Sequence, residues 1–201
     1  MAKAIYLKNK KVELFGNGSS SNSSSVHEKE IEPFYITGFT DGEGCFSLSF
    51  RKVSRLKMGV EVRPTFSISQ KKSKRNYKLL EQFRRAFKGG SVRADKRGLY
   101  KYETRSLCHI RSHVIPFFQK YPLQSEKLYH FVLFCEACSL VAAKQHLNTA
   151  GLLKIVSIAE KMNLSGQKRL ALSDLRALLK KQETEVQTCT NNVMIAPLSQ
   201  K

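Results

Sequence analysis

Apolar and polar residues alternate at every second position in two segments of the chain. The first covers residues 45–51 and the second residues 60–69, where Pro64 interrupts the pattern. A period of two is typical of strands that bury one face and expose the other. We therefore predict an antiparallel sheet with one apolar face and one polar, basic face. Pro64 cannot donate a hydrogen bond to a neighbouring strand, so we expect a bulge or exposed backbone there.

Other segments carry apolar residues three to four positions apart, which is typical of amphipathic helices. The first begins at Pro33, a residue suited to the first turn of a helix, and ends at Gly42 and Gly44. A second hairpin is predicted over residues 91–107, with its turn near Gly98. Further helices are predicted over residues 76–87, 123–146, 151–163 and 171–182, with a short helix or turn, interrupted by Pro116, over residues 113–121. The order αββαββα, followed by extra C-terminal helices, predicts an α+β fold.

Composition divides the 201 residues into three parts. Residues 16–30 are rich in Gly, Ser and Asn and then charged, so residues 1–30 are predicted to form an N-terminal arm and a flexible linker. Residues 31–182 form the predicted domain, and residues 183–201 a flexible tail. No apolar run approaches the roughly 20 residues that cross a bilayer, and the basic N-terminus lacks the apolar stretch of a secretory signal.

The cysteines and the net charge narrow the function. The five cysteines are odd in number and scattered, which suits a reducing compartment, and we expect Cys135 and Cys138 to be packing residues of a buried helix. Lys and Arg number 35 against 16 acids, a formal net charge of +19 that favours a polyanionic partner. Charge alone fits a ribosomal or merely well-solvated basic protein equally well. Helicase or NTPase activity is not supported, because the chain has no G-x-x-x-x-G-K-[ST] phosphate loop.

The first predicted helix ends with residues 36–44, ITGFTDGEG, which carry the candidate chemistry. Gly38 has no side chain, so a second helix can approach closely at this position. Glu43 lies between glycines at the junction of helix and strand, where its carboxylate is available for binding. Mg²⁺ typically takes one or two carboxylates together with water and phosphate oxygens. The alternative is that Glu43 is a solvent-facing acid in a turn.

These residues resemble the LAGLIDADG motif in its G-F-x-D-G-E-G form. The similarity to single-motif LAGLIDADG homing endonucleases extends over residues 33–163, through two hairpins, the strand end TFSISQK and a later F-F-x-x-Y-P-L-x-x-x-K segment. It implies a four-stranded saddle that binds double-stranded DNA, and Mg²⁺-dependent cleavage of both strands at a long pseudo-palindromic site. It also implies a gene within a group I intron of an organelle, with the chloroplast favoured over the mitochondrion.

The resemblance assigns the metal site and the dimer interface. Glu43 is expected to bind the metal together with Gly42, and Asp41 more often caps or braces the helix end in this family. A cut in both strands needs two active centres, and the chain has one motif and no internal repeat. A twofold homodimer satisfies this requirement. We expect its interface at Gly38, with the flanking residues Phe39 and Ile36.

Three further catalytic residues follow from the resemblance. Gln70 aligns with a polar residue that positions water, and Lys74 with a basic residue near the scissile phosphate. Lys127 resembles the lysine of a P-L-x-x-K-K segment that stabilises developing charge or polarises water. Here the segment reads PLQSEK, with Glu126 where a lysine often stands, so the lysine assignment has an uncertainty of one position. The alternative for both lysines is a solvated basic face.

The outward strand residues form the predicted DNA-reading surface, because a two-stranded ribbon fits the major groove. Arginine prefers guanine there, and glutamate accepts from cytosine. The predicted DNA-binding residues are Ser47, Ser49, Arg51, Glu61, Arg63, Thr65, Ser67, Ser69, Lys71, Ser91, Arg93, Asp95, Lys101, Glu103 and Arg105. Basic residues of the intervening loop (Lys52, Arg55, Lys57), with Lys72 and Arg75, are expected to contact phosphates.

Two other functions of the same fold stay open. An intron maturase would bind its host group I intron RNA with the same charge but a degraded catalytic acid. A non-catalytic DNA-binding protein would retain the sheet and lose the chemistry. The presence of Glu43 and Gln70 favours an active nuclease.

Overall fold

The computed structural model describes residues 30–162. Residues 1–29 of the predicted arm and linker, the predicted helix over residues 171–182, the tail and Cys189 lie outside the described residues. Within them the elements follow the predicted order of helices and strands, so the α+β class is confirmed. Among the described helices, none is both long and apolar enough to cross a membrane.

Four strands form one antiparallel sheet in the order β1-β2-β4-β3. The two predicted hairpins are confirmed, and they join through β2 and β4. The turn of the second hairpin contains Gly98 at φ +79°, a conformation that glycine adopts without steric cost. The strands are β1 (Gly44–Lys52), β2 (Val60–Lys71), β3 (Ser91–Ala94) and β4 (Leu99–Thr104).

Pro64 lies within β2 without a bulge. It pairs with Leu48 of β1 in a register that runs unbroken along both strands. The missing amide is tolerated because β2 meets β4 only from Phe66 onward, so Pro64 lies where one edge of β2 is unpaired. Of the two predicted alternatives, the unpaired strand edge is present and the bulge is not.

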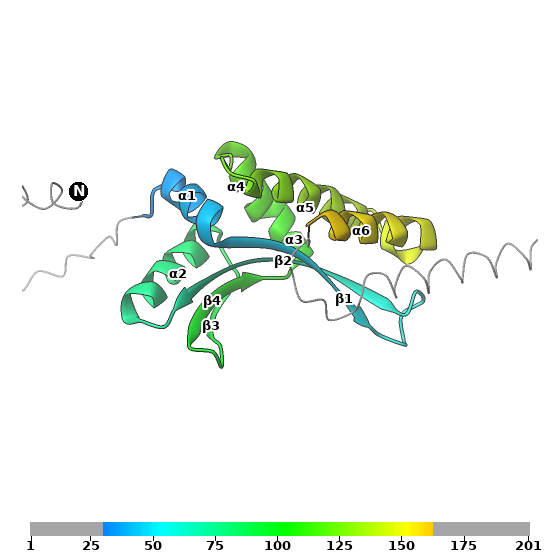
Figure 1. The fold of residues 1–201 in the computed structure, drawn as a ribbon, viewed down its shortest axis with the longest axis horizontal. Helices are drawn as coiled ribbons and strands as arrows, with labels where there is room; N and C mark the ends of the chain where they lie inside the picture. The colour runs from blue at the N-terminus through cyan, green and yellow to red at the C-terminus, as the bar shows by residue number, and fades with distance from the viewer. Residues whose placement is uncertain (1–29, 163–201) are drawn as a thin grey trace, which may run out of the picture.

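The helices lie on one face of the sheet, with α1, α4, α5 and α6 above it in Figure 1. The structure differs from the prediction in the segment that leads into α4, for which the sequence predicts a short helix or turn interrupted by Pro116. Residues 107–120 form one continuous stretch, namely the short α3 (Leu107–His109), a π-helical turn (Ile110–Val114) and α4 (Ile115–Lys120). Pro116 does not end it, and the π-helical turn directly before the proline is the kind of local adjustment that accommodates a missing amide inside a helix. The longer helices are α1 (Pro33–Glu43), α2 (Lys74–Ala86), α5 (Lys127–Ala142) and α6 (Thr149–Met162).

Aromatic side chains form the centre of the core between the helices and the sheet. Phe66 of β2 is fully buried, and its ring centroid lies 4.9 Å from that of Phe46. The rings of Phe87 and Phe118 meet it edge to face at 5.4 and 5.6 Å. Cys138 is buried and Cys135 half-buried in α5, as expected of packing residues, and burial raises the pKa of both thiols to about 12.

Candidate active site and nucleic-acid interface

Glu43 is the last residue of α1, and its side chain is exposed. The turn behind it requires glycine, since a Cβ on Gly44 would lie 2.6 Å from the carbonyl oxygen of Thr40. The amide of Gly44 donates to that same oxygen and ends the helix. Helix C-termini present unpaired carbonyls and a partial negative charge, which attract cations. A carboxylate at this end strengthens that attraction.

Asp41, two residues before Glu43, joins α1 to the start of α5. Its Oδ2 accepts from the amide of Gln124 at 2.9 Å, and its Oδ1 accepts from the Ser125 hydroxyl at 2.7 Å and from the Ser125 amide at 3.2 Å. The carboxylate is therefore committed to a structural contact, the bracing role expected for this position. The sequence pattern gave no signal for its partners, which lie more than 80 residues away.

Lys127 is positioned through the same contact. It is the first residue of α5, and its amide donates to the Ser125 hydroxyl oxygen at 3.1 Å. Since the Ser125 hydroxyl in turn donates to Asp41, a continuous series of hydrogen bonds joins the motif helix to Lys127. The half-buried Lys127 thus begins a helix whose N-terminus is fixed to the end of α1.

Gln70 lies near the end of β2, the strand that pairs with β1, and Lys74 is the first residue of α2, the helix that follows β2. Gly44 lies opposite Ile68, so Gln70 is two positions further along β2, on the same side of the sheet as Ile68. Lys74 is exposed at the first turn of α2, whose cap is Ser73, the acceptor of the Asn76 amide. Neither Lys74 nor Lys127 forms a salt bridge with a described residue.

The donor set at the end of α1 fits a hard cation in part. Within residues 30–162, no group of three His, Cys, Asp or Glu side chains lies close enough together to enclose a metal ion. One carboxylate of Glu43 and the carbonyl of the exposed Gly42 are available there. Mg²⁺ commonly retains several waters and takes one or two carboxylates plus phosphate oxygens. These residues therefore fit a magnesium ion completed by water and a bound nucleic acid.

One side of α1 is exposed although it is apolar. Phe34 is 72% exposed and Tyr35 50% exposed, and a Cβ added at Gly38 would meet nothing within 4 Å. Phe39 is half-buried against Phe83. Ile36 is only 1% exposed and packs into the chain's own core, so it offers almost no surface to a partner. The reason is helical geometry, because Ile36 lies about 200° around the helix from Gly38.

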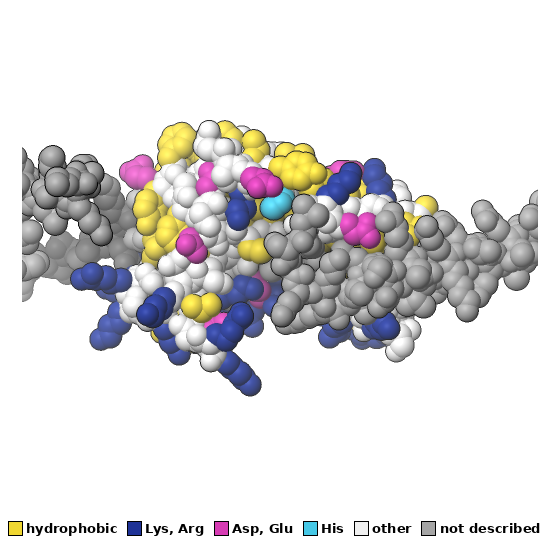
Figure 2. Space-filling view, in the orientation of Figure 1, with side chains coloured by type: hydrophobic (Ala, Val, Ile, Leu, Met, Phe, Trp, Pro, Cys, Tyr) yellow, Lys and Arg dark blue, Asp and Glu magenta, His cyan; other side chains and the backbone are white. Residues whose placement is uncertain are grey.

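The outer face of the sheet carries the polar row that alternation predicted. Cross-strand pairs on this face are Cys45 with Ser67, Ser47 with Thr65, Ser49 with Arg63, Arg51 with Glu61, Ser67 with Glu103, Ser69 with Lys101, Ser91 with Glu103, and Arg93 with Lys101. No described element covers this face. Lys and Arg project from the lower left of the molecule in Figure 2, where Figure 1 shows α2 and the β3–β4 hairpin.

Thr65, Ser67 and Asp95 depart from the expectation of free outward groups. Thr65 and Ser67 are 7% and 5% exposed; both are short side chains on β2, which lies between β1 and β4. Asp95 lies in the β3–β4 turn, where its Oδ1 accepts from the amides of Leu99 and Arg97. The Leu99 amide, with the Arg97 amide and guanidinium, holds the pKa of Asp95 below its usual value. Its geometry is that of a turn-forming residue.

Both outward glutamates are paired with cations. Glu61 Oε2 lies 2.9 Å from Arg63 Nη2 and 3.3 Å from Arg51 Nε, and the Arg63 hydrogen bond lowers the pKa of Glu61. Glu103 is only 7% exposed. Burial alone would raise its pKa, but Lys101 and nearby Arg105 outweigh burial and lower it. The strand pattern predicted the direction of these acids but not their pairing.

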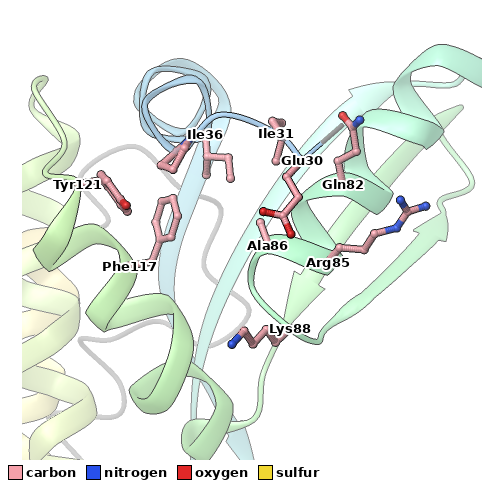
Figure 3. Close-up of a pocket in the computed structure, with 10 residues that line it drawn as sticks. Glu30, Ile31, Ile36, Gln82, Arg85, Ala86, Lys88, Phe117 and Tyr121 are labelled. Carbon is pink, nitrogen blue, oxygen red and sulfur yellow. The ribbon is translucent and has the colours of Figure 1, made fainter. Parts of the chain in front are cut away.

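A cavity of about 410 Å³ lies between α1, α2 and α4 (Figure 3). It adjoins the N-terminal half of α1, at Pro33 and Ile36, so it is separate from Glu43 at the other end of the helix. Apolar side chains and the cations Arg85 and Lys88 line it, and no described group of metal-binding side chains lies in it.

Comparison with known proteins agrees with this arrangement. The model of the LAGLIDADG endonuclease family matches residues 36–138, from the motif helix to α5. A 50.9 kDa uncharacterised protein in ND4 intron 1 of Podospora anserina is 31% identical over 138 residues, covering 68% of this chain and 30% of that protein. A probable intron-encoded endonuclease 2 of Neurospora crassa is 29% identical over 162 residues, covering 75% and 36%. The chain thus spans about a third of the length of these relatives.

Two solved structures share the fold. The homing endonuclease I-TnaI is 30% identical, with a TM-score of 0.64, covering 79% of this chain and 99% of that chain. I-SmaMI bound to an uncleaved DNA target in the presence of calcium ions is 32% identical, with a TM-score of 0.67, covering 75% and 49%. The four-stranded sheet, the exposed Glu43 at the end of the motif helix and a family match over half of the sequence lead to one assignment: this chain belongs to the LAGLIDADG endonuclease family.

Proposed function

We propose that this protein is a site-specific DNA endonuclease that cuts both strands of a long pseudo-palindromic site in a Mg²⁺-dependent reaction. The observation that carries the proposal is the exposed Glu43 at the C-terminus of α1, beside a sheet whose outer face is polar and uncovered by described elements. I-SmaMI, which shares the fold, is bound to a DNA target in its structure. That similarity supports double-stranded DNA as the partner of the outer face.

Each proposed catalytic residue has a chemical task. Glu43 and the Gly42 carbonyl would hold Mg²⁺, which supplies Lewis-acid activation of water and stabilises the leaving oxygen in phosphodiester hydrolysis. Gln70 orients the attacking water through its side-chain amide. Lys127 and Lys74 donate to phosphate oxygens and stabilise the negative charge that develops on them.

A homodimer supplies the second active centre. The exposed stripe of Phe34, Tyr35 and Gly38 supports it, because large apolar side chains around an open glycine suit a close helix contact. The matched region equals about half of I-SmaMI, which supports a unit that works in pairs. Sedimentation should give about twice the 22.9 kDa chain mass. Gly38→Leu should shift the protein to the monomer and abolish cleavage together, whereas a wild-type monomer that cuts both strands would refute the dimer.

The decisive test of the nuclease is Glu43→Gln. This change keeps the size of the side chain and removes its charge, so Mg²⁺-dependent cleavage of a plasmid carrying the target should fall to background. Duplex binding, measured in Ca²⁺, should stay nearly intact. Asp41→Asn is the matched comparison, because its carboxylate braces α5 and its loss should reduce stability more than chemistry. Wild-type cleavage rates in Glu43→Gln would remove this residue from the mechanism.

The gene is proposed to lie in an intron of an organellar genome. The relatives' names describe intron-encoded proteins of the fungi Podospora anserina and Neurospora crassa. Fungi have no chloroplasts, so the expected preference for the chloroplast gains no support, and we propose the mitochondrion. If the flanking DNA is an intron, the joined exons are the predicted target. Tight binding to that intron's RNA without cleavage of the joined exons would indicate a maturase.

A further inference from the structure

The outer face of β4 contains a carboxylate that is nearly inaccessible. Glu103 is 7% exposed and lies opposite Ser67 of β2 and Ser91 of β3. On a face that binds DNA, an unpaired carboxylate would repel phosphates, and burying it would cost free energy. Its place in the middle of this face therefore needs a compensating interaction.

Three cations supply that interaction. Lys101 Nζ lies 2.8 Å from Glu103 Oε1, and Arg105 Nη2 lies 2.7 Å from Oε2. Arg93 Nη2 of β3 lies 3.6 Å from Oε2. Lys101 lies two residues before Glu103 on the same face of β4, and Arg105 lies two residues after it, directly beyond the end of the strand. We call these four residues the Glu103 cluster.

The cations of the cluster remain accessible while their common partner does not. The exposed fractions of the side chains are 67% for Arg93, 54% for Arg105 and 39% for Lys101. Each therefore has donors left for a base edge or a phosphate after pairing with Glu103. Both oxygens of Glu103 already accept from cations, so this glutamate is poorly placed to accept from cytosine, the role predicted for it from sequence.

Glu61, at the other end of the outer face, provides a contrast. Its side chain is 35% exposed, and both of its ion pairs, to Arg51 and Arg63, use Oε2. Glu61 can still reach a base, whereas Glu103 cannot without breaking its cluster. The two acids therefore have different tasks on one surface.

We propose that Glu103 is a positioning residue for sequence reading. It orders Arg93, Lys101 and Arg105 before DNA binds, and it does not itself contact a base. Long cationic side chains lose rotamer freedom on binding, and ordering them in advance lowers that cost and narrows the bases they accept. This inference rests on the proposed function, because it assumes that the outer face reads DNA. It predicts that one residue controls discrimination at several neighbouring base pairs.

The test compares full-length wild type with Glu103→Gln on a library of randomised duplexes, in Ca²⁺, by sequencing the bound fraction. Discrimination should fall about tenfold at each of several neighbouring base pairs, the same positions that Arg93→Ala, Lys101→Ala and Arg105→Ala affect singly. Affinity for random duplex should stay equal or rise, since one negative charge is lost. Glu136→Gln in α5, which pairs with Lys154 away from the sheet, is the charge-matched control and should change neither quantity.

Rescue separates positioning from a structural role. Glu103→Asp keeps the charge and shortens the reach by one methylene, so it should restore part of the lost discrimination. If a thermal scan shows that Glu103→Gln is not folded, Glu103→Asp alone should still lose discrimination at several base pairs. Loss confined to one base pair, with its preference for cytosine, would overturn the proposal in favour of a direct contact. Unchanged discrimination in both variants would overturn it too. Failure of the proposed function is a different result, since wild type itself would then prefer no duplex.

Discussion

The two faces of the same four strands follow opposite rules. On the inner face Phe46, Phe66 and Tyr102 are at most 4% exposed, and they contact aromatic rings of α4, of α5 and of the end of α2. On the outer face, one position along the strand from each of them, most side chains are polar or charged, and no described element covers them. The inner face therefore determines whether the protein folds, and the outer face determines what it binds.

This separation follows from strand geometry. Successive side chains point to opposite sides, so a single segment such as β2 contributes Phe66 to the core and Ser67 to the outer surface. Residues on the two faces can then change independently. If the outer row reads DNA as proposed, substitutions in it can change the target while the inner row preserves the fold.

The largest expected effect comes from the inner face. Phe66→Ala removes the ring that lies among those of Phe46, Phe87 and Phe118, and it leaves a cavity. The free energy of unfolding should fall by about 3–5 kcal/mol, measured by urea denaturation. Ser67→Ala, the next residue on the opposite face, should change it by less than about 1 kcal/mol. Equal losses in both variants would contradict the division of labour between the faces.

Much of this division is predictable from sequence, because it depends on local periodicity. Alternation in residues 45–51 and 60–69 gave the two faces, and the glycines around Glu43 indicated the end of the motif helix. Each of these signals lies within a dozen residues of the feature that it predicts.

The rest depends on contacts between distant segments. The brace from Asp41 to Ser125 spans 84 positions, and no local pattern encodes it. Ile36 seemed to flank an interface, but packing of α1 on the sheet turns it inward. One of the cations that pair with Glu103, Arg93, comes from another strand, so the full cluster depends on the register of β3 against β4.

The next largest effect concerns base reading on the outer face. Arg63 is paired with Glu61, and its side chain is 33% exposed. Arg63→Ala should cost about 1–3 kcal/mol of binding free energy on the matched site and relax preference at one base pair. Competition between the matched duplex and single-base variants measures both quantities. If the loss is the same for every duplex, Arg63 contacts the backbone and the reading face is misassigned at that position.

A smaller expected effect is a difference between the two faces in how the free energy of unfolding of their variants depends on pH. The pKa values of Glu61 and Glu103 are lowered in the folded protein, by Arg63 in the first case and by Lys101 and Arg105 against burial in the second. Their stabilising contribution is complete above the ordinary glutamate pKa of 4.5 and is lost as pH falls through the lowered values. The stability deficit of Glu103→Gln should therefore be constant above the ordinary glutamate pKa of 4.5 and shrink as the pH falls below it. The deficit of Phe66→Ala should not shrink, because no charge is involved. A constant deficit for Glu103→Gln, measured by denaturation at each pH, would argue against the ion pairs.

The smallest effect is expected from the loop between β1 and β2. Lys57 is exposed there, and no described residue forms a salt bridge with it. Contact with a phosphate adds affinity without sequence information, because every base pair presents the same backbone. Lys57→Ala should thus weaken matched and unmatched duplexes by the same factor and reduce the slope of log affinity against log salt by about one unit. Lys161→Ala in α6, on the covered side of the sheet, removes the same charge and should leave the slope unchanged. A loss of affinity confined to the matched duplex would indicate that Lys57 contacts a base. An equal change of slope in Lys57→Ala and Lys161→Ala would indicate that only the net charge of the protein matters.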